Sequence, residues 1–277
     1  MSALPAFHVH LDVLLVLGGV AAAYLWAVRD HERRTGEPVD VRRRRMFLGG
    51  VATLLAGATW PLHDLAEGYL YSMHMVQHML FTFRGAPLLL AGAPSWLWRR
   101  ILTPAPLRAV WSVVTRPVVA LVVANGVLLL THWPEIVELS VSSEPIHFGL
   151  HVLVVGSAVV MWWPVLSPLP ELPALSPPGQ MLYLFLQSLA PTIPASFLTF
   201  GTEPLYPVYA TFPRIWGIDP LTDQLIAGLV MKLVGGAILW AVIAVVFFRW
   251  GHQERTEGWD ALKFRNVEHE LRTELRR

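Results

Sequence analysis

The chain has 277 residues, of which 54% are hydrophobic and only 15% are charged, and its mean hydropathy is +0.49. A soluble domain carries about 25% charged residues, so this composition excludes a water-soluble globule. The absence of cysteine excludes a disulfide scaffold and thiolate metal sites. We therefore expect an all-α, polytopic membrane protein.

Seven segments are apolar and long enough to cross a lipid bilayer, which takes roughly 20 residues of α-helix. In chain order they cover residues 9–28, 46–66, 71–93, 117–133, 146–166, 181–201 and 223–248. The sixth segment contains Pro191 and Pro194, which membrane helices tolerate when neighbouring groups satisfy the freed backbone. The sequence predicts a seven-helix transmembrane domain over residues 1–250 and a charged cytoplasmic tail over residues 251–277.

Basic residues are divided unevenly between the segments that connect these spans. Eighteen of the 21 lysines and arginines lie in the connections 29–45 and 94–116 and in the tail from Arg249, whereas the connections on the other side contain only Arg214. Basic connections stay in the cytoplasm. This distribution predicts an N-terminus outside and a C-terminus in the cytoplasm. Anionic lipid accounts for the basic connections, so we expect no nucleic-acid partner.

Histidines gather near the predicted outer ends of the spans. Six of the eleven lie at that level: His63, His74, His78, His132, His147 and His151. Four of them form two pairs with four-residue spacing, which places both rings of a pair on one helix face. The rise of 1.5 Å per residue puts these four within roughly the outermost 2–11 Å of their helices. His8 and His10 lie in the N-terminal flank, and we assign them no role.

The two pairs predict a metal site. One helical pair offers two imidazoles to a single ion, and two facing pairs supply four nitrogens. Met73, Met75 and Met79 surround the first pair, and thioether with imidazole suits soft Cu(I) better than Mg²⁺ or Ca²⁺. We expect copper, as Cu(I), to be bound by His74, His78, His147 and His151, with His63 as a further ligand. The alternative for each residue is a packing or hydrogen-bonding role.

Other polar residues also lie at or within the predicted spans. Arg84 and Lys232 fall about 13–15 Å below the outer surface, where a charge is costly unless it is paired or hydrated. Asp64, Glu67 and Asp223 lie at outer helix ends, where carboxylates are commonly caps, and Asp223 is interpreted as an N-terminal charge or cap of the seventh span. The alternative is that such a carboxylate orients a ligating imidazole.

Aromatic residues near the outer ends are interpreted as an outer aromatic belt. They are Trp60, Tyr71, Trp133, Tyr206, Tyr209 and Trp216.

The segment 61–94, PLHDLAEGYLYSMHMVQHMLFTFRGAPLLLAGAP, resembles the signature of the CtaG family of bacterial cytochrome c oxidase assembly factors. IHFGLHVLVVGSAVVMWWPVLSPLP, from Ile146, is similar to a second block of that family, and DPLTDQLIAGLVMK, from Asp219, is similar to a weaker third block. The resemblance implies a seven-span protein of the bacterial cell (inner or plasma) membrane that aids maturation of a haem–copper oxidase through copper delivery. It also implies that the family's paired histidines are His74, His78, His147 and His151.

The leading hypothesis is therefore a membrane assembly factor, not an enzyme, that binds copper and passes it to a cytochrome c oxidase subunit or to another copper chaperone. Two alternatives remain open. Histidines from two helices are also the ligands of a b-type haem, as in a membrane haem protein or oxidoreductase. Histidines and mid-membrane cations also line the path of a metal- or proton-coupled transporter.

Overall fold

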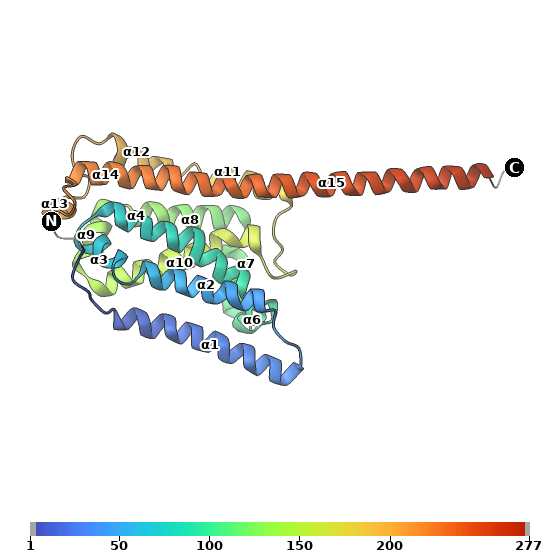
Figure 1. Cartoon of the computed structure of the whole chain (residues 1–277), viewed down its shortest axis with the longest axis horizontal. Coiled ribbons are helices and arrows are strands. Elements are labelled where there is room, and N and C mark those ends of the chain that lie inside the picture. The colour runs from blue at the N-terminus through green and yellow to red at the C-terminus, as the bar shows by residue number, and fades with distance from the viewer. Residues whose placement is uncertain (1–3, 275–277) are drawn as a thin grey trace.

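The computed structural model describes residues 4–274, and the side chains of residues 4–256. Over residues 4–274 the chain is helical and contains no strand. Most helices lie side by side along one direction, and the last one extends well beyond the others (Figure 1). The α-helices and the two π-helices, η1 and η2, are α1 (Leu11–Thr35), α2 (Val41–Gly57), α3 (Leu62–Gly68), α4 (Tyr71–Leu80), η1 (Phe81–Gly85), α5 (Ala86–Gly92), α6 (Ser95–Ile101), α7 (Ala105–Val114), α8 (Pro117–Thr131), α9 (Pro134–Ser142), α10 (Glu144–Leu166), α11 (Pro177–Gln187), α12 (Thr192–Phe200), α13 (Pro207–Thr211), α14 (Pro220–Leu229), η2 (Val230–Val234) and α15 (Gly235–Glu274).

Helices lie in all seven segments that the sequence marks as apolar, although not all of them are long. Among the described residues, four stretches are long and apolar enough to cross a membrane: Leu11–Thr35, Glu144–Leu166, Pro177–Phe200 and Pro220–Thr256. A fifth is added if α7 and α8, bent by 86° at their junction, form one broken span. Helices α2 and α8 have only 17 and 15 residues, fewer than the roughly 20 that a full crossing takes. The count of seven spans and the orientation of the termini stay predictions.

The predicted boundary at residue 250 between the membrane domain and the tail reflects a change in amino-acid composition and does not coincide with the end of a helix. Helix α15 continues through residue 250 to Glu274. The side chains beyond Thr256, which make up most of the predicted charged tail, lie outside the described residues.

Two π-helical turns interrupt the third and seventh predicted spans, and each contains one of the mid-membrane cations. Arg84 lies in η1 and Lys232 in η2. Lys232 Nζ donates to Thr192 Oγ1, whereas Arg84 is exposed and makes no ion pair within the described part of the chain. Turns of this kind occur frequently at functional sites.

Trp162 connects α10 to the third predicted span. Trp162 is buried, and its Nε1 donates to the backbone carbonyl of Thr82 at 2.8 Å. Thr82 lies in η1, where the i→i+4 hydrogen-bond pattern of the α-helix is interrupted. The indole therefore satisfies a carbonyl in the turn and fixes α10 against the helix that carries His74 and His78.

Glycines allow α2 and α5 to pack in close contact. A Cβ atom on Gly92 would lie 2.3 Å from the backbone nitrogen of Phe47, and one on Gly50 would lie 2.9 Å from that of Leu89. Membrane helices approach closely where small residues line their interface. This contact fixes the third predicted span against the second.

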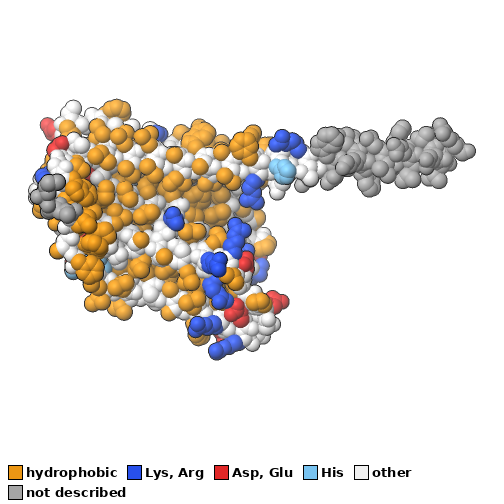
Figure 2. Space-filling model, in the orientation of Figure 1, with side chains coloured by type: hydrophobic (Ala, Val, Ile, Leu, Met, Phe, Trp, Pro, Cys, Tyr) orange, Lys and Arg blue, Asp and Glu red, His pale blue; other side chains and the backbone are white. Residues whose placement is uncertain are grey.

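Charged residues mark one end of the bundle. Arg100 pairs with Asp30 at 3.3 Å and Arg44 pairs with Glu32 at 2.8 Å, which links α6, α1 and α2. Figure 2 shows the lysines and arginines gathered toward this end, which we call the basic end. The opposite end contains α3, the first turns of α4 and α10 and the last turn of α8; we call it the histidine end (Figure 1).

Candidate metal centre at the histidine end

Three histidines from two helices meet inside the histidine end. His74 and His78 project from α4, and His151 projects from α10. The ring centroids of His74 and His78 are 4.3 Å apart, as expected for a four-residue spacing, and His151 lies 6.2 Å from the first and 6.0 Å from the second. One nitrogen from each of the three rings lies within 4.8 Å of the other two. We call these residues the inner triad.

The inner triad offers electron pairs that no described group uses. His74 Nδ1 and His151 Nε2 are buried without a hydrogen-bond partner in the described part of the chain. Leaving a buried polar atom unsatisfied costs about 1–3 kcal/mol, so a ligand at these nitrogens would recover that energy. Nitrogens bound to one ion at about 2.0–2.1 Å lie roughly 3.3–3.5 Å apart. Small rotations of the three rings would reach this geometry, so the residues fit an imidazole-bound metal ion.

A second group lies beside the inner triad and is built around one carboxylate. Glu67 Oε1 lies 3.1 Å from His63 Nδ1 and also pairs with His147 Nε2. Gln77 Nε2 lies 3.1 Å from the same His63 nitrogen, and Ser140 Oγ lies 2.9 Å from His147 Nδ1. The ring centroids of His147 and His151 are 4.1 Å apart, so the two groups are in contact. Partners of this kind fix the orientation of a histidine ring. At His147 the carboxylate accepts from Nε2, whereas His63 Nδ1 can serve only one of its two neighbours at a time, because Glu67 accepts and Gln77 Nε2 donates.

His132 and Met75 extend the cluster on the side facing α8. His132 Nδ1 lies 2.7 Å from the Leu128 carbonyl, which only accepts, so this nitrogen donates. In the neutral ring Nε2 then carries a lone pair, and it lies 3.5 Å from the Met75 sulfur, a second electron-pair donor. The His78 ring is 6.0 Å from that of His132. Imidazole nitrogen facing thioether sulfur suits a soft cation such as Cu(I).

Asp223 positions the helix that carries the first histidine pair. Its carboxylate accepts the backbone N–H groups of Tyr71 at 2.7 Å and Ser72 at 3.0 Å, which are free because they lie in the first turn of α4. The N-cap of α14 is Asp219, which accepts from Leu221 and Thr222. Asp223 does lie in the first turn of α14, as an N-terminal charge of the seventh span would, but it is not the cap of that helix. It caps the third span, because α14 packs beside α4.

The tyrosines near this end form a buried cluster. Tyr71, Tyr206 and Tyr209 are only 2%, 2% and 4% exposed, so their assignment to an outer aromatic belt is wrong. The rings of Tyr206 and Tyr209 contact Tyr71, with centroids 4.5 and 5.0 Å away, and Tyr71 stacks on His74 at 5.7 Å. The Tyr206 hydroxyl donates to the backbone carbonyl of His132 at 2.8 Å. This cluster supports the rings of the inner triad from the side of α13.

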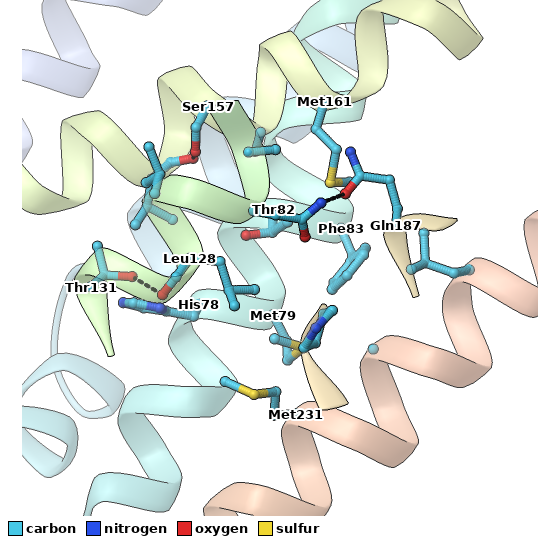
Figure 3. A pocket seen from close by; sticks show the side chains of 18 of the residues that line it. His78, Met79, Thr82, Phe83, Leu128, Thr131, Ser157, Met161, Gln187 and Met231 are labelled. Atoms are coloured by element: carbon cyan, nitrogen blue, oxygen red, sulfur yellow. Dashed lines mark hydrogen bonds between the residues drawn. The ribbon is translucent and has the colours of Figure 1, made fainter. Parts of the chain in front are cut away.

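Two cavities border the cluster. A pocket of about 540 Å³ is lined by His8, His10, Asp64, His63, Glu67 and His147, and it also reaches His151. A smaller cavity of about 70 Å³ lies deeper in the bundle, and Figure 3 shows His78, Met79 and Met231 on one of its sides and Met161 on another. Met75 and His132 also line it. The histidines thus lie between a pocket with carboxylates and imidazoles in its lining and a mostly apolar cavity whose lining includes four methionines and Lys232.

The structure brings together all five residues that the sequence nominates as metal ligands, namely His63, His74, His78, His147 and His151, and places His132 beside them. The sequence left open that Glu67 orients a ligating imidazole, and the structure places it against His63 and His147. Sequence reasoning did not identify Ser140 as a partner of His147, nor the approach of His8 and His10. The four-residue spacing of His63 and Glu67 indicates that the two side chains are neighbours on one helix face.

Comparison with known proteins identifies the family. Residues 22–253 match the family model described as cytochrome c oxidase caa3 assembly factor. This range contains all six clustered histidines and both π-turns. No curated protein and no solved structure matches the chain. Because the family model covers most of its length, the chain belongs to the cytochrome c oxidase caa3 assembly factor (CtaG) family.

Proposed function

We propose that this protein binds Cu(I) at the inner triad, His74, His78 and His151, and passes it to a cytochrome c oxidase subunit or another copper chaperone during oxidase assembly. The observation that carries the proposal is the meeting of three imidazoles from two helices: His74 and His78 are buried, His151 is half-buried, and His74 and His151 each have a buried nitrogen without a partner. His63 and His147 complete the ligand set as the ion enters or leaves. This role is non-catalytic.

The chemistry of the surroundings favours copper in its reduced state. The cluster supplies imidazole nitrogen and, at Met75, thioether sulfur within 3.5 Å of His132 Nε2, and this donor set prefers soft cations. Hard ions such as Mg²⁺ and Ca²⁺ require several oxygen ligands, and the inner triad provides none. Neutral ligands hold a metal without the charge of a thiolate, which suits an ion that must later be released.

The position of the site suits delivery on the outer side of the bacterial plasma membrane. With the basic end in the cytoplasm, the histidine end lies at the outer surface, and the 540 Å³ pocket faces that side. A partner subunit in the same membrane would receive the ion there. We propose seven spans with this orientation, which places α2 and α8 as short crossings within the bundle.

Haem binding is less well supported, because the cavity between the histidines is too small for a macrocycle. The cavity lined by His74, His78 and His151 has a volume of only about 10 Å³, so a macrocycle would require α4 and α10 to move apart. The absence of a Soret band after purification with haem supplied would leave this alternative without support.

Copper binding by purified protein tests the proposal. Protein in detergent, loaded anaerobically with Cu(I) and challenged with a chromophoric chelator, should retain about one ion per chain. The double variant His74→Ala/His78→Ala should retain none. A matched control is His31→Ala/His252→Ala, which removes two histidines from the basic end and the tail and should bind as wild type. Equal retention by both variants would overturn the proposal.

A further inference from the structure

A third group of metal-ligating side chains lies at the mouth of the large pocket, outside the site described above. His10 Nε2 lies 3.0 Å from Asp64 Oδ2, and the ring centroids of His8 and His10 are 4.8 Å apart. One ligand atom from each of His8, His10 and Asp64 lies within 4.8 Å of the other two. His8 is exposed, whereas the inner triad is enclosed.

The N-terminal segment that carries these histidines is attached to the bundle. Trp60 Nε1 donates to the Pro5 carbonyl at 3.1 Å, and the Phe7 ring packs edge-on against Trp60 with centroids 5.5 Å apart. His8 and His10 are two residues apart in the irregular stretch before α1, and a ring nitrogen of each lies within 4.8 Å of an Asp64 carboxylate oxygen. The segment therefore presents both rings to Asp64 on α3.

This group is continuous with the buried histidines. The His10 ring lies 4.5 Å from that of His63, which lies 5.5 Å from His147 and 6.2 Å from His151. All of these residues line the same 540 Å³ pocket. From the surface to the inner triad, each histidine ring thus lies close to the next. A metal ion can bind the next imidazole before it dissociates from the previous one.

We propose that His8, His10 and Asp64 form a second metal site, at which the ion for the buried cluster first binds. Imidazole binds copper in either oxidation state, so Cu(I) would bind here through His8 and His10 and pass inward as Cu(I), and a single carboxylate is too few for Mg²⁺ or Ca²⁺. The loading role rests on the proposed function and requires no change in the oxidation state of the ion. The family match begins at residue 22, so the two histidines of this site lie outside the matched range.

Cu²⁺, used alone as a paramagnetic probe, tests whether the site exists. The full-length His74→Ala/His78→Ala variant should still bind Cu²⁺ and give an electron paramagnetic resonance spectrum with nitrogen hyperfine coupling. Adding His8→Ala and His10→Ala should weaken this binding by at least about 100-fold, and Asp64→Asn should weaken it less. An unchanged spectrum and affinity after loss of His8 and His10 would overturn the proposed site.

The rate of Cu(I) loading tests the role of the site. The His8→Ala/His10→Ala variant should reach the wild-type amount of chelator-resistant Cu(I), but about tenfold more slowly. The His31→Ala/His252→Ala protein should load at the wild-type rate. Loading of the first variant at the wild-type rate would overturn the loading role and leave copper binding by the inner triad intact. Conversely, if the His74→Ala/His78→Ala variant retains Cu(I), the proposed function fails. The Cu²⁺ measurement would then still show whether His8, His10 and Asp64 bind a metal ion.

Discussion

The Asp223 carboxylate accepts the backbone N–H of Tyr71 at 2.7 Å, so a side chain of α14 caps the first turn of α4. The same carboxylate accepts the N–H of Ser72. His74 lies in the following turn, and the position of its ring therefore depends on a contact between two helices that are distant in the sequence. Asp223 is 1% exposed, so breaking this interaction would leave buried polar groups without hydrogen-bond partners.

Replacement of Asp223 by asparagine should both destabilise the protein and weaken copper binding. Asparagine has one acceptor oxygen in place of two, so one buried N–H of α4 loses its partner at a cost of about 1–3 kcal/mol. The shift of His74 should lower Cu(I) affinity about tenfold. Thermal unfolding and chelator competition measure the two effects. Asp219→Ala, which removes the cap of α14, is the control: it should lower the melting temperature and leave Cu(I) affinity unchanged. Equal affinity losses in both variants would contradict a specific role of Asp223.

The cap at Asp219 should also depend on pH. Hydrogen bonds from the Thr222 hydroxyl and from backbone N–H groups lower the pKa of Asp219 below its ordinary value. Its contribution to stability is therefore fully present above the unfolded pKa of about 3.9 and is lost as pH falls through the lower folded value. The difference in melting temperature between wild type and Asp219→Ala should shrink below about pH 4 and stay constant between about pH 6 and pH 8. A difference that changes across this range would show that another group titrates with the cap.

Glu67→Gln should weaken metal binding while the protein stays folded. The carboxylate holds both His63 and His147, and the loss of its charge removes the orienting partner of two rings at once. Loss of such a partner lowers metal affinity by about 10–100-fold. Glu144→Gln is the matched control, because Glu144 lines the same pocket but has no histidine contact among the described residues. Isothermal titration with Cu(I) under a competing chelator compares the two, and the proposed role fails if both variants bind as wild type.

Met75→Leu should change the preference of the site for soft ions. Leucine has nearly the same volume as methionine, so packing is kept, but the sulfur facing His132 Nε2 is lost. Affinity for Cu(I), or for Ag⁺ as its stable analogue, should fall about tenfold, whereas affinity for Zn²⁺ should not change. Met161→Leu removes a thioether from the far side of the same cavity (Figure 3) and serves as the control. A parallel loss of Ag⁺ and Zn²⁺ affinity would indicate a packing effect only.

Gly92→Ala should destabilise the bundle at the contact between α2 and α5. The added Cβ would lie 2.3 Å from the Phe47 backbone nitrogen and 2.6 Å from its Cα, so the helices must separate, and overpacking of this kind costs about 1–3 kcal/mol. Gly18→Ala adds a methyl group to α1 where no atom lies within 4 Å, and it should leave stability unchanged or raise it slightly. Thermal unfolding in one detergent compares the pair, and similar melting temperatures would refute the close packing.

The sequence by itself determined the class of the protein, its apolar segments and the spacing of its histidines. These are local properties: hydropathy over about 20 residues marks a membrane helix, and the 3.6-residue period places His74 beside His78 and His147 beside His151. The quoted motifs were also sufficient to indicate the family, which the family model confirms over residues 22–253.

Only the tertiary structure decided which side chains meet across helices. The approach of His151 to His74, the sharing of Glu67 by His63 and His147, and the return of His10 to Asp64 all join different helices or segments. Their geometry depends on how closely and at what rotation the helices pack, which the glycine contacts and π-turns set. The helical period fixes the direction of a side chain relative to its own helix axis. It carries no information on the neighbour that the side chain faces, because that neighbour is chosen by packing among distant parts of the chain.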